Sequence, residues 1–352
     1  MTTADSIRVA IIGFGLIGTE WDRSTSADAT ALTHARAFSR NKRVQLLAMC
    51  DQDGDRARSA SQYWQVAHFY TDPLKMFSEQ EIDVAVIATP SSVRWSVIEP
   101  AIAAGVRVLV IEKPLATSVE ETRRLVAAID AAGVRSVVNF SRNWDPSMRE
   151  LKYRIAAGDM GKVQRVVATY GKGIGNNGSH LIDLTGFLCD SRPLRARALS
   201  SPFDDGEAAW STAGERAWDA QVEFLDAKGV RTNLTLLGTD QRAFTCFELQ
   251  IIGQKAIFNL SMGGRRQSWT GLQADPNFVG YVVPAPAVAL SSRYLESMQE
   301  MANEVVQLAA GDISTASCDA HSALRTALAV NAIQLSALGN GQWITLDNLK
   351  NE

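Results

Sequence analysis

The feature that most constrains the fold is a glycine pattern directly after a short apolar run near the N-terminus. The run covers residues 7–12 (IRVAII), and Gly13-x-Gly15-x-x-Gly18 follows at once. The first glycine permits a tight turn, the second lets the backbone approach a pyrophosphate, and the third lets a helix pack closely on the strand. We therefore expect a dinucleotide-binding Rossmann domain that holds phosphates on free N–H groups at the helix start. The predicted cofactor loop consists of Gly13, Phe14, Gly15, Leu16, Ile17 and Gly18.

Short β-branched runs alternate with alanine-rich segments through the first 140 residues. Near-continuous apolar runs separated by amphipathic segments are typical of a parallel sheet that helices cover on both faces. We expect strands at residues 7–12, 44–50, 83–88, 106–111 and 134–140. We expect helices at residues 30–39, 55–64, 93–104, 118–132 and 146–157.

The second half of the chain has a different texture, because short apolar runs are joined there by tight turns such as residues 226–229. This pattern predicts an antiparallel sheet. The Gly- and Pro-rich stretch 263–286 is expected to be a loop, either a lid or a surface excursion. The predicted fold class is an α/β Rossmann domain at 1–140, then an α+β domain at 141–352 whose C-terminal helix could pack back on the first. Strands are expected there at residues 163–169, 220–225, 230–237, 247–252, 256–260 and 343–346, and long helices at 291–310 and 319–338.

Charge and cysteine content exclude several classes of protein. The 35 basic and 38 acidic residues are interspersed, so the net charge of −3 offers no surface for nucleic acid or an anionic membrane. No stretch approaches the roughly 20 apolar residues of a membrane span, and the N-terminus does not resemble a signal peptide. No CxxC pair occurs, which favours reduced thiols and a cytoplasmic protein without bound metal. The cysteines are Cys50, Cys189, Cys246 and Cys318.

Asp51 stands where a ribose-binding acidic residue is expected, at the end of the second apolar run. It lies 38 positions after Gly13, whereas about 20 is usual, so the polar stretch 20–29 is interpreted as a loop inserted before the first helix. Its carboxylate would accept hydrogen bonds from a ribose diol and repel a 2′-phosphate, which favours NAD over NADP. The alternative is an exposed turn aspartate.

Two more runs end in residues that suit a cofactor crevice. The run at 83–88 is followed by Thr89-Pro90, and the run at 106–111 by Glu112-Lys113-Pro114. Ligands bind at the carboxyl ends of parallel strands, so we expect Thr89, Pro90, Glu112 and Lys113 to line the cofactor site. A lysine after a buried run is costly unless it functions or is paired, and a structural salt bridge is the alternative. The bond before Pro114 could be cis.

His180 is the natural acid/base candidate among only four histidines. It follows a glycine-rich turn in GNNGSHLID, and Asp183 shares its helical face three residues later. A structural histidine is the alternative at this position.

Three motifs in this order resemble the Gfo/Idh/MocA family of oxidoreductases: GFGLIG at 13–18, EKP at 112–114 and GSHLID at 178–183. The resemblance implies a second domain with a large open sheet, which in this family often mediates dimers or tetramers. It also implies hydride transfer between a nicotinamide and a carbinol carbon of a sugar, polyol or sugar nucleotide. Flanking stretches that match as well are residues 88–90, 139–146, 158–163 and 327–346.

The resemblance also assigns roles to residues. Lys113 matches the family's active-site lysine and His180 its catalytic histidine. Many members hold an aspartate four positions before that histidine, but this chain has Asn176, and Arg94 stands where a histidine often follows the Thr-Pro motif. An asparagine cannot stabilise an imidazolium by charge, so either His180 or Lys113 could transfer the proton. Asparagine variants favour a sugar-nucleotide substrate.

Asn176 and Asp183 would orient the histidine or substrate hydroxyls. Arg142 and Lys172 would anchor an anionic substrate group, unless they are ordinary surface charges. Two other functions remain open: a glycosidase or eliminase that uses NAD transiently and forms no net NADH, and a non-enzymatic NAD-sensing regulator. Retention of both Lys113 and His180 argues against the regulator.

Overall fold

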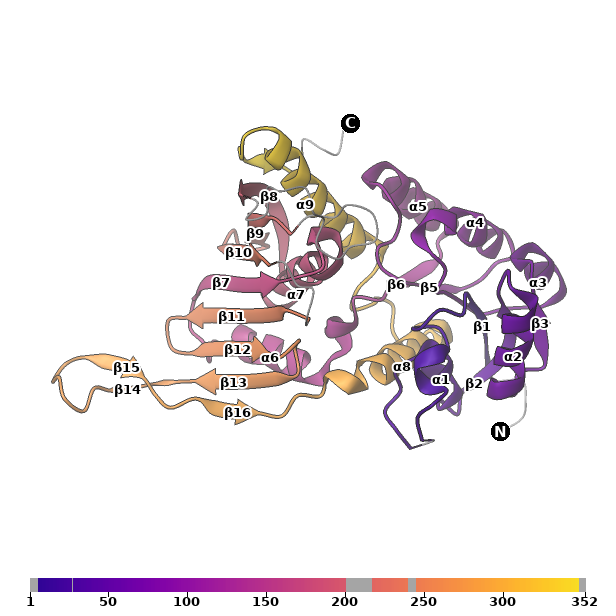
Figure 1. Ribbon diagram of the computed structural model, residues 1–352, viewed down its shortest axis with the longest axis horizontal. Coiled ribbons are helices and arrows are strands. Elements are labelled where there is room, and N and C mark those ends of the chain that lie inside the picture. Colours follow the sequence, from indigo (N-terminus) through magenta and orange to yellow (C-terminus); the bar gives the residue numbers. More distant parts are fainter. Residues whose placement is uncertain (1–5, 27, 201–216, 240–244, 348–352) are drawn as a thin grey trace. The chain divides into compact units, whose positions relative to one another are not determined.

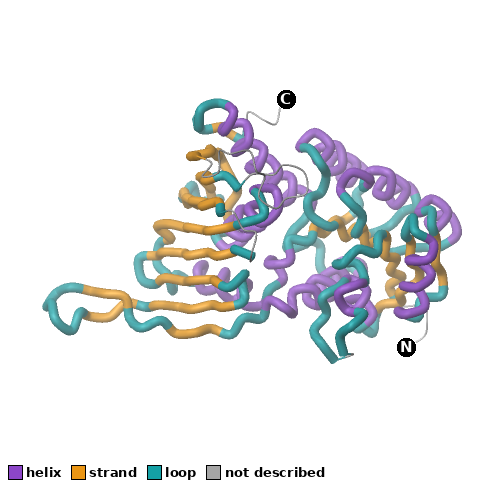
Figure 2. Tube along the Cα trace, in the orientation of Figure 1, coloured by secondary structure: helices purple, strands orange, loops and turns teal. Residues whose placement is uncertain are grey.

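The computed structural model describes residues 6–347 except for 27, 201–216 and 240–244. The chain divides into two compact units (Figures 1 and 2). The first consists of Met1–Asp145 with Leu295–Leu324, and the second of Pro146–Tyr294 with Arg325–Glu352. The expected second domain at 141–352 is therefore not continuous, since one of its helices belongs to the first unit.

The first unit contains a six-stranded sheet in the order β3-β2-β1-β4-β5-β6. Every neighbouring pair is parallel, as predicted for a Rossmann domain. The strands are β1 (Ile7–Ile12), β2 (Val44–Cys50), β3 (His68–Tyr70), β4 (Val84–Ile87), β5 (Val108–Ile111) and β6 (Arg135–Val138). The helices are α1 (His34–Ser39), α2 (Gly54–Trp64), α3 (Pro73–Glu79), α4 (Trp95–Ala103), α5 (Val119–Ala132) and α8 (Ser297–Ala310).

Helix ends in this unit follow from local chemistry. The Asp53 side chain accepts hydrogen bonds from the backbone at the start of α2, and Ser118 does the same for α5. Helix α5 ends at Gly133, whose φ of 65° is left-handed and suits glycine. Strand β3 and helix α3 were not predicted, because a three-residue strand with two exposed residues leaves no apolar run in the sequence.

Residues 295–324 belong to the first unit because helix α8 packs there. Its buried residues include Met301, Val305 and Leu308, and the helix contacts α1, β1 and β5. A parallel sheet needs apolar cover on both faces, and α8 supplies part of that cover here.

The second unit is built on a nine-stranded sheet in the order β16-β13-β12-β11-β7-β10-β9-β8-β17. Only β7 and β10 pair in parallel among the described strands of this sheet, so the predicted mostly antiparallel character is confirmed. Its strands are β7 (Val163–Tyr170), β8 (Ser191–Ser200), β9 (Asp219–Asp226), β10 (Arg231–Gly238), β11 (Phe247–Gly253), β12 (Ile257–Ser261), β13 (Arg266–Thr270), β16 (Val288–Leu290) and β17 (Ile344–Thr345). Helices α6 (Pro146–Ala156) and α7 (Ser179–Leu188) lie wholly in this unit, and α9 (Ala320–Leu338) begins in the first unit.

The expectation that residues 263–286 form a loop is wrong, because the structure has strands there. Residues 266–270 form β13, and β14 (Leu272–Ala274) pairs with β15 (Val282–Pro284) as a hairpin that extends beyond the sheet (Figure 1). No strand was expected here, because β13 (RQSWT) is polar and the residues of β14 and β15 are mostly exposed, so neither leaves an apolar run in the sequence.

The two faces of the nine-stranded sheet differ in chemistry. On β9, Val222 and Phe224 are buried, and a Cβ added to Gly186 of α7 would lie 3.5 Å from the Phe224 ring. The alternate positions carry polar groups: Glu223 accepts hydrogen bonds from Arg195 at 3.0 Å and from Arg231 at 2.6 Å. One face is thus the apolar core of this unit, and the other is a polar ladder.

Phe224→Ala should destabilise the protein, because it empties a fully buried site between sheet and helix. We expect the free energy of unfolding to fall by about 3–5 kcal/mol. Gln221→Ala, on the polar face of the same strand, is the matched control and should cost under about 1 kcal/mol. Denaturant titration measures both, and equal losses for the two variants would contradict this assignment of faces.

Candidate active site

Two of the three glycines in the loop stand where a side chain would collide with the backbone. Gly13 has φ 91°, and a Cβ there would lie 2.8 Å from the backbone of Thr89. A Cβ on Gly18 would lie 2.5 Å from the Gly13 carbonyl oxygen. By contrast, a Cβ on Gly15 would meet nothing within 4 Å, so open space lies above the middle of the loop. That space fits the pyrophosphate of a dinucleotide.

The segment after this loop is inserted between the turn of the loop and helix α1. The backbone N–H of His34 donates to the Ile17 carbonyl at 3.0 Å, and that of Ala35 donates to Gly18 at 3.1 Å. These partners lie 17 positions apart, whereas helical hydrogen bonds join residues four apart. About 13 residues are therefore inserted between the turn and the helix. The insertion accounts for most of the excess spacing between Gly13 and Asp51.

Asp22, which sequence reasoning missed, organises the inserted segment. Its fully buried carboxylate accepts hydrogen bonds from Thr33 Oγ1 at 2.6 Å, Thr33 N at 2.8 Å and Leu32 N at 3.0 Å. Arg36 Nη2 donates to the Asp22 carbonyl at 2.7 Å. A buried charge needs such partners, and here they fix the point where α1 begins.

Asp51 is buried at the end of β2, so the alternative of an exposed turn aspartate is wrong. Its carboxylate accepts hydrogen bonds from Phe14 N at 2.8 Å and Asp53 N at 3.0 Å, and Arg56 Nη1 lies 3.8 Å away. Asp51 therefore ties the glycine loop to the end of β2. Four acceptor positions on a carboxylate leave room for further donors.

Glu112, at the end of β5, is held by residues that sequence reasoning did not single out. His34 Nε2 lies 2.7 Å from Glu112 Oε1, and Asn139 Nδ2 donates to the same oxygen at 2.7 Å. Hydrogen bonding by His34 is the largest influence that lowers the pKa of Glu112, against desolvation, and Asn139 and the positive charge of Arg94 act in the same direction. The available signal was Thr33-His34, a helix cap followed by a histidine.

Arg94 and Thr89 form the neighbouring corner at the end of β4. Arg94 is 3% exposed, and its Nε and Nη2 donate to the Thr89 carbonyl at 3.2 and 3.1 Å. Burial lowers the pKa of Arg94 to about 10, against the opposing effect of Glu112. Lys113 follows directly after Glu112, and the Lys113-Pro114 bond is cis, as the sequence suggested.

In the second unit, Asn176 and His180 lie on consecutive turns. Asn176 belongs to the π-helical turn Ile174–Gly178, and His180 lies on α7 with Asp183. A Cβ on Gly178 would lie 2.6 Å from the end of the Ile174 side chain, so any larger residue there would displace Ile174. His180 is half-buried, with the Phe247 ring 6.5 Å away in an edge-on arrangement.

The two suggested anion anchors lie in different settings. Arg142 is buried in the 3-10 turn Ser141–Trp144, so its alternative as a surface charge is wrong. Lys172 is half-buried and has φ 62°, directly before Gly173 with φ 80°. The backbone therefore turns sharply at Lys172, ahead of the π-helical segment.

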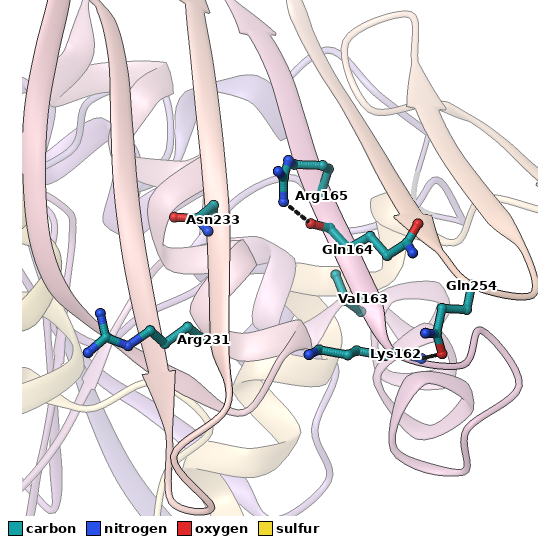
Figure 3. A pocket seen from close by; sticks show the side chains of 7 residues that line it. All are labelled: Lys162, Val163, Gln164, Arg165, Arg231, Asn233 and Gln254. Carbon is teal, nitrogen blue, oxygen red and sulfur yellow. Dashed lines mark hydrogen bonds between the residues drawn. The ribbon is translucent and has the colours of Figure 1, made fainter.

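A pocket of about 570 Å³ lies elsewhere on the second unit (Figure 3). No predicted site residue lines it. Its lining is polar and positively charged, and consists of Lys162, Val163, Gln164, Arg165, Arg231, Asn233 and Gln254.

Three further findings concern the described part of the chain. No cluster of three or more His, Cys, Asp or Glu residues there could hold a metal ion. None of its helices is long and apolar enough to span a membrane. All four cysteines are free thiols.

Residues 7–140 match the GFO_IDH_MocA family model, described as an oxidoreductase family with an NAD-binding Rossmann fold. Inositol 2-dehydrogenase 4 of Saccharopolyspora erythraea is 35% identical over 44% of this chain and 43% of the relative. The chain thus matches less than half the length of this relative. Inositol 2-dehydrogenase of Rhodococcus erythropolis is 24% identical, over 81% of this chain and 79% of the relative.

A solved structure extends the likeness to the whole fold. It is an inositol dehydrogenase homologue from Azotobacter vinelandii, with a TM-score of 0.73 and 18% identity, covering 97% of this chain and 98% of the other. At this identity the likeness concerns the fold, including the second unit that the family model does not reach. The comparisons thus show that residues 7–140 are similar to the NAD-binding Rossmann domain of the GFO_IDH_MocA oxidoreductase family.

Proposed function

We propose that the protein is an NAD-dependent dehydrogenase that acts on a CH–OH group of a polyol or sugar. The observation that carries the proposal is the glycine loop, with its open space above Gly15, within a domain of an NAD-binding oxidoreductase family. Two similar proteins are named inositol 2-dehydrogenases, which supports a polyol or sugar substrate.

NAD is the proposed cofactor in preference to NADP. Phe14, Leu16, Ile17 and the three glycines would hold its phosphates, and Asp51 would accept hydrogen bonds from the adenosine ribose. A solved structure of similar fold is described as a complex with NAD⁺, which supports this choice. Thr89, Pro90, Glu112 and Lys113 would complete the cofactor site at the ends of β4 and β5.

When bound, NAD supplies the nicotinamide that accepts the hydride. Lys113 would hydrogen-bond the reacting oxygen and stabilise its developing negative charge, and His180 would accept the hydroxyl proton. Because Asn176 replaces a carboxylate, the imidazolium lacks a charged partner at that position, and Lys113 remains the other candidate for proton transfer. Asn176 and Asp183 would orient the histidine or substrate hydroxyls.

A sugar nucleotide is the narrower substrate proposal. The asparagine at position 176 and the candidate anion anchors Arg142 and Lys172 are the features that support it. We further propose a cytoplasmic homodimer or homotetramer. The polar open face of the nine-stranded sheet supports assembly, and four free thiols suit a reducing compartment.

Lys113→Ala should lower turnover at least about 100-fold while leaving NAD affinity nearly unchanged, because the amine acts on the reacting oxygen. Absorbance of NADH over a panel of polyols, sugars and nucleotide sugars measures turnover, and calorimetry measures NAD binding. Turnover like that of the wild type would contradict the assignment. Substrate conversion without net NADH would instead indicate the transient-oxidation glycosidase.

Gly15→Val should weaken NAD binding at least about tenfold with little loss of stability, because its side chain would occupy the open space where the pyrophosphate approaches. Gly271→Val is the matched control, since a Cβ there also meets nothing within 4 Å. NAD titration and thermal unfolding report on each. Undiminished NAD affinity in Gly15→Val would reject the loop as the phosphate site.

A further inference from the structure

The two carboxylate oxygens of Glu112 lie in different surroundings. Oε1 accepts hydrogen bonds from both His34 and Asn139, each at 2.7 Å. No described residue makes a hydrogen bond or ion pair to Oε2. The Glu112 side chain is 12% exposed while that of His34 is 1% exposed, so the carboxylate reaches a surface that the histidine does not. Oε2 is therefore an available acceptor.

The histidine acts here as a donor. His34 Nδ1 is buried and has no hydrogen-bond partner among the described residues. The ring proton is consequently needed at Nε2, where it is donated to the carboxylate. A fixed tautomer and a fixed ring orientation give Oε1 a defined position.

The second donor comes from a different element and restricts the carboxylate further. Asn139 follows β6 directly, and its amide also lies 3.5 Å from the Met298 sulfur on α8. Two donors converging on one oxygen fix the rotation of the carboxylate, and hence the direction of Oε2. The positive charge of Arg94 also lowers the pKa of Glu112. In turn, the negative charges of Glu112 and Glu121 raise the pKa of Arg94.

Strand order indicates which half of a dinucleotide would reach Glu112. Strand β1, which carries the glycine loop, lies between β2 and β4, and β5 lies beyond β4. Dinucleotides bind across the crevice at the point where strand order reverses. With the adenosine ribose bound at Asp51, as proposed above, the nicotinamide half would be expected over β4 and β5. Its ribose hydroxyls are donors that a free carboxylate oxygen accepts.

We propose that His34 and Asn139 are positioning residues, which hold Oε1 of Glu112 and so present Oε2 to a hydroxyl of the nicotinamide ribose. The proposal rests on the proposed NAD binding and assigns a function to a histidine outside the predicted site. The inserted segment contributes as well, because Asp22 fixes Thr33 immediately before His34.

The test compares two ligands, NAD and ADP, because ADP lacks the nicotinamide riboside. His34→Ala should weaken NAD binding about tenfold or more and change ADP binding less than about twofold. His34→Gln should recover most of the NAD affinity, since its amide N–H can replace the Nε2 donor. Calorimetry gives the dissociation constants, and His321→Ala, at an exposed histidine, is the control.

Asn139→Ala removes the other donor without touching the inserted segment, and the same selective loss of NAD affinity is expected. Equal weakening of NAD and ADP by His34→Ala and Asn139→Ala would indicate damage to the glycine loop and overturn the proposal. Unchanged NAD affinity in both variants would overturn it too. Glu112→Ala separates cofactor binding by Glu112 from the positioning of Glu112 by His34. If only this variant weakens NAD binding, Glu112 binds the cofactor without being positioned by His34. If the wild type binds no NAD, the proposed function itself fails.

Discussion

The burial of the Asp22 carboxylate is the interaction on which the cofactor half of the structure depends. An inserted segment of about 13 residues would normally separate a glycine loop from its helix. Here Asp22 gathers donors from Thr33 and Leu32, which closes the insertion and lets α1 continue from Ile17 and Gly18. The turn of the glycine loop thus stays joined to α1 by backbone hydrogen bonds, despite the interruption in sequence. A polar network achieves what adjacency in the chain achieves in a shorter Rossmann domain.

The start of α1 at His34 also connects this helix to the ends of β5 and β6. Because α1 begins at His34, its first side chain lies within hydrogen-bond reach of Glu112 at the end of β5. Asn139 joins the same oxygen from the end of β6. Loop, helix and two strand ends are therefore linked through one carboxylate. Glu112 and the glycine loop are far apart in sequence, so only the folded sheet brings them together.

Sequence reasoning succeeded where one local pattern determined the result. The glycine loop, the buried strands of the first unit and the cap at Gly133 each depend on short-range chemistry, and their positions were predictable. Strand β8 was missed because SRPLRARALS carries arginine at every second or third position, and β13 because RQSWT is a polar sequence with no apolar run. The partners of Asp22 and Glu112 could not be predicted, since both sets depend on long-range packing that no single-sequence pattern encodes.

The residue at position 94 influences how the ionisation of Glu112 depends on pH. A histidine there would change charge near neutrality, whereas the pKa of Arg94, although lowered to about 10 by burial, keeps the guanidinium charged at neutral pH. It helps hold the pKa of Glu112 below its usual value, so Glu112 stays a carboxylate. A carboxyl group whose pKa is lowered in the folded protein stabilises the fold at pH values above its unfolded-state pKa. This contribution is lost as the pH falls through the folded-state pKa. His34 and Asn139, with a smaller contribution from the charge of Arg94, thus keep Glu112 an acceptor at the end of β5 that only acid removes.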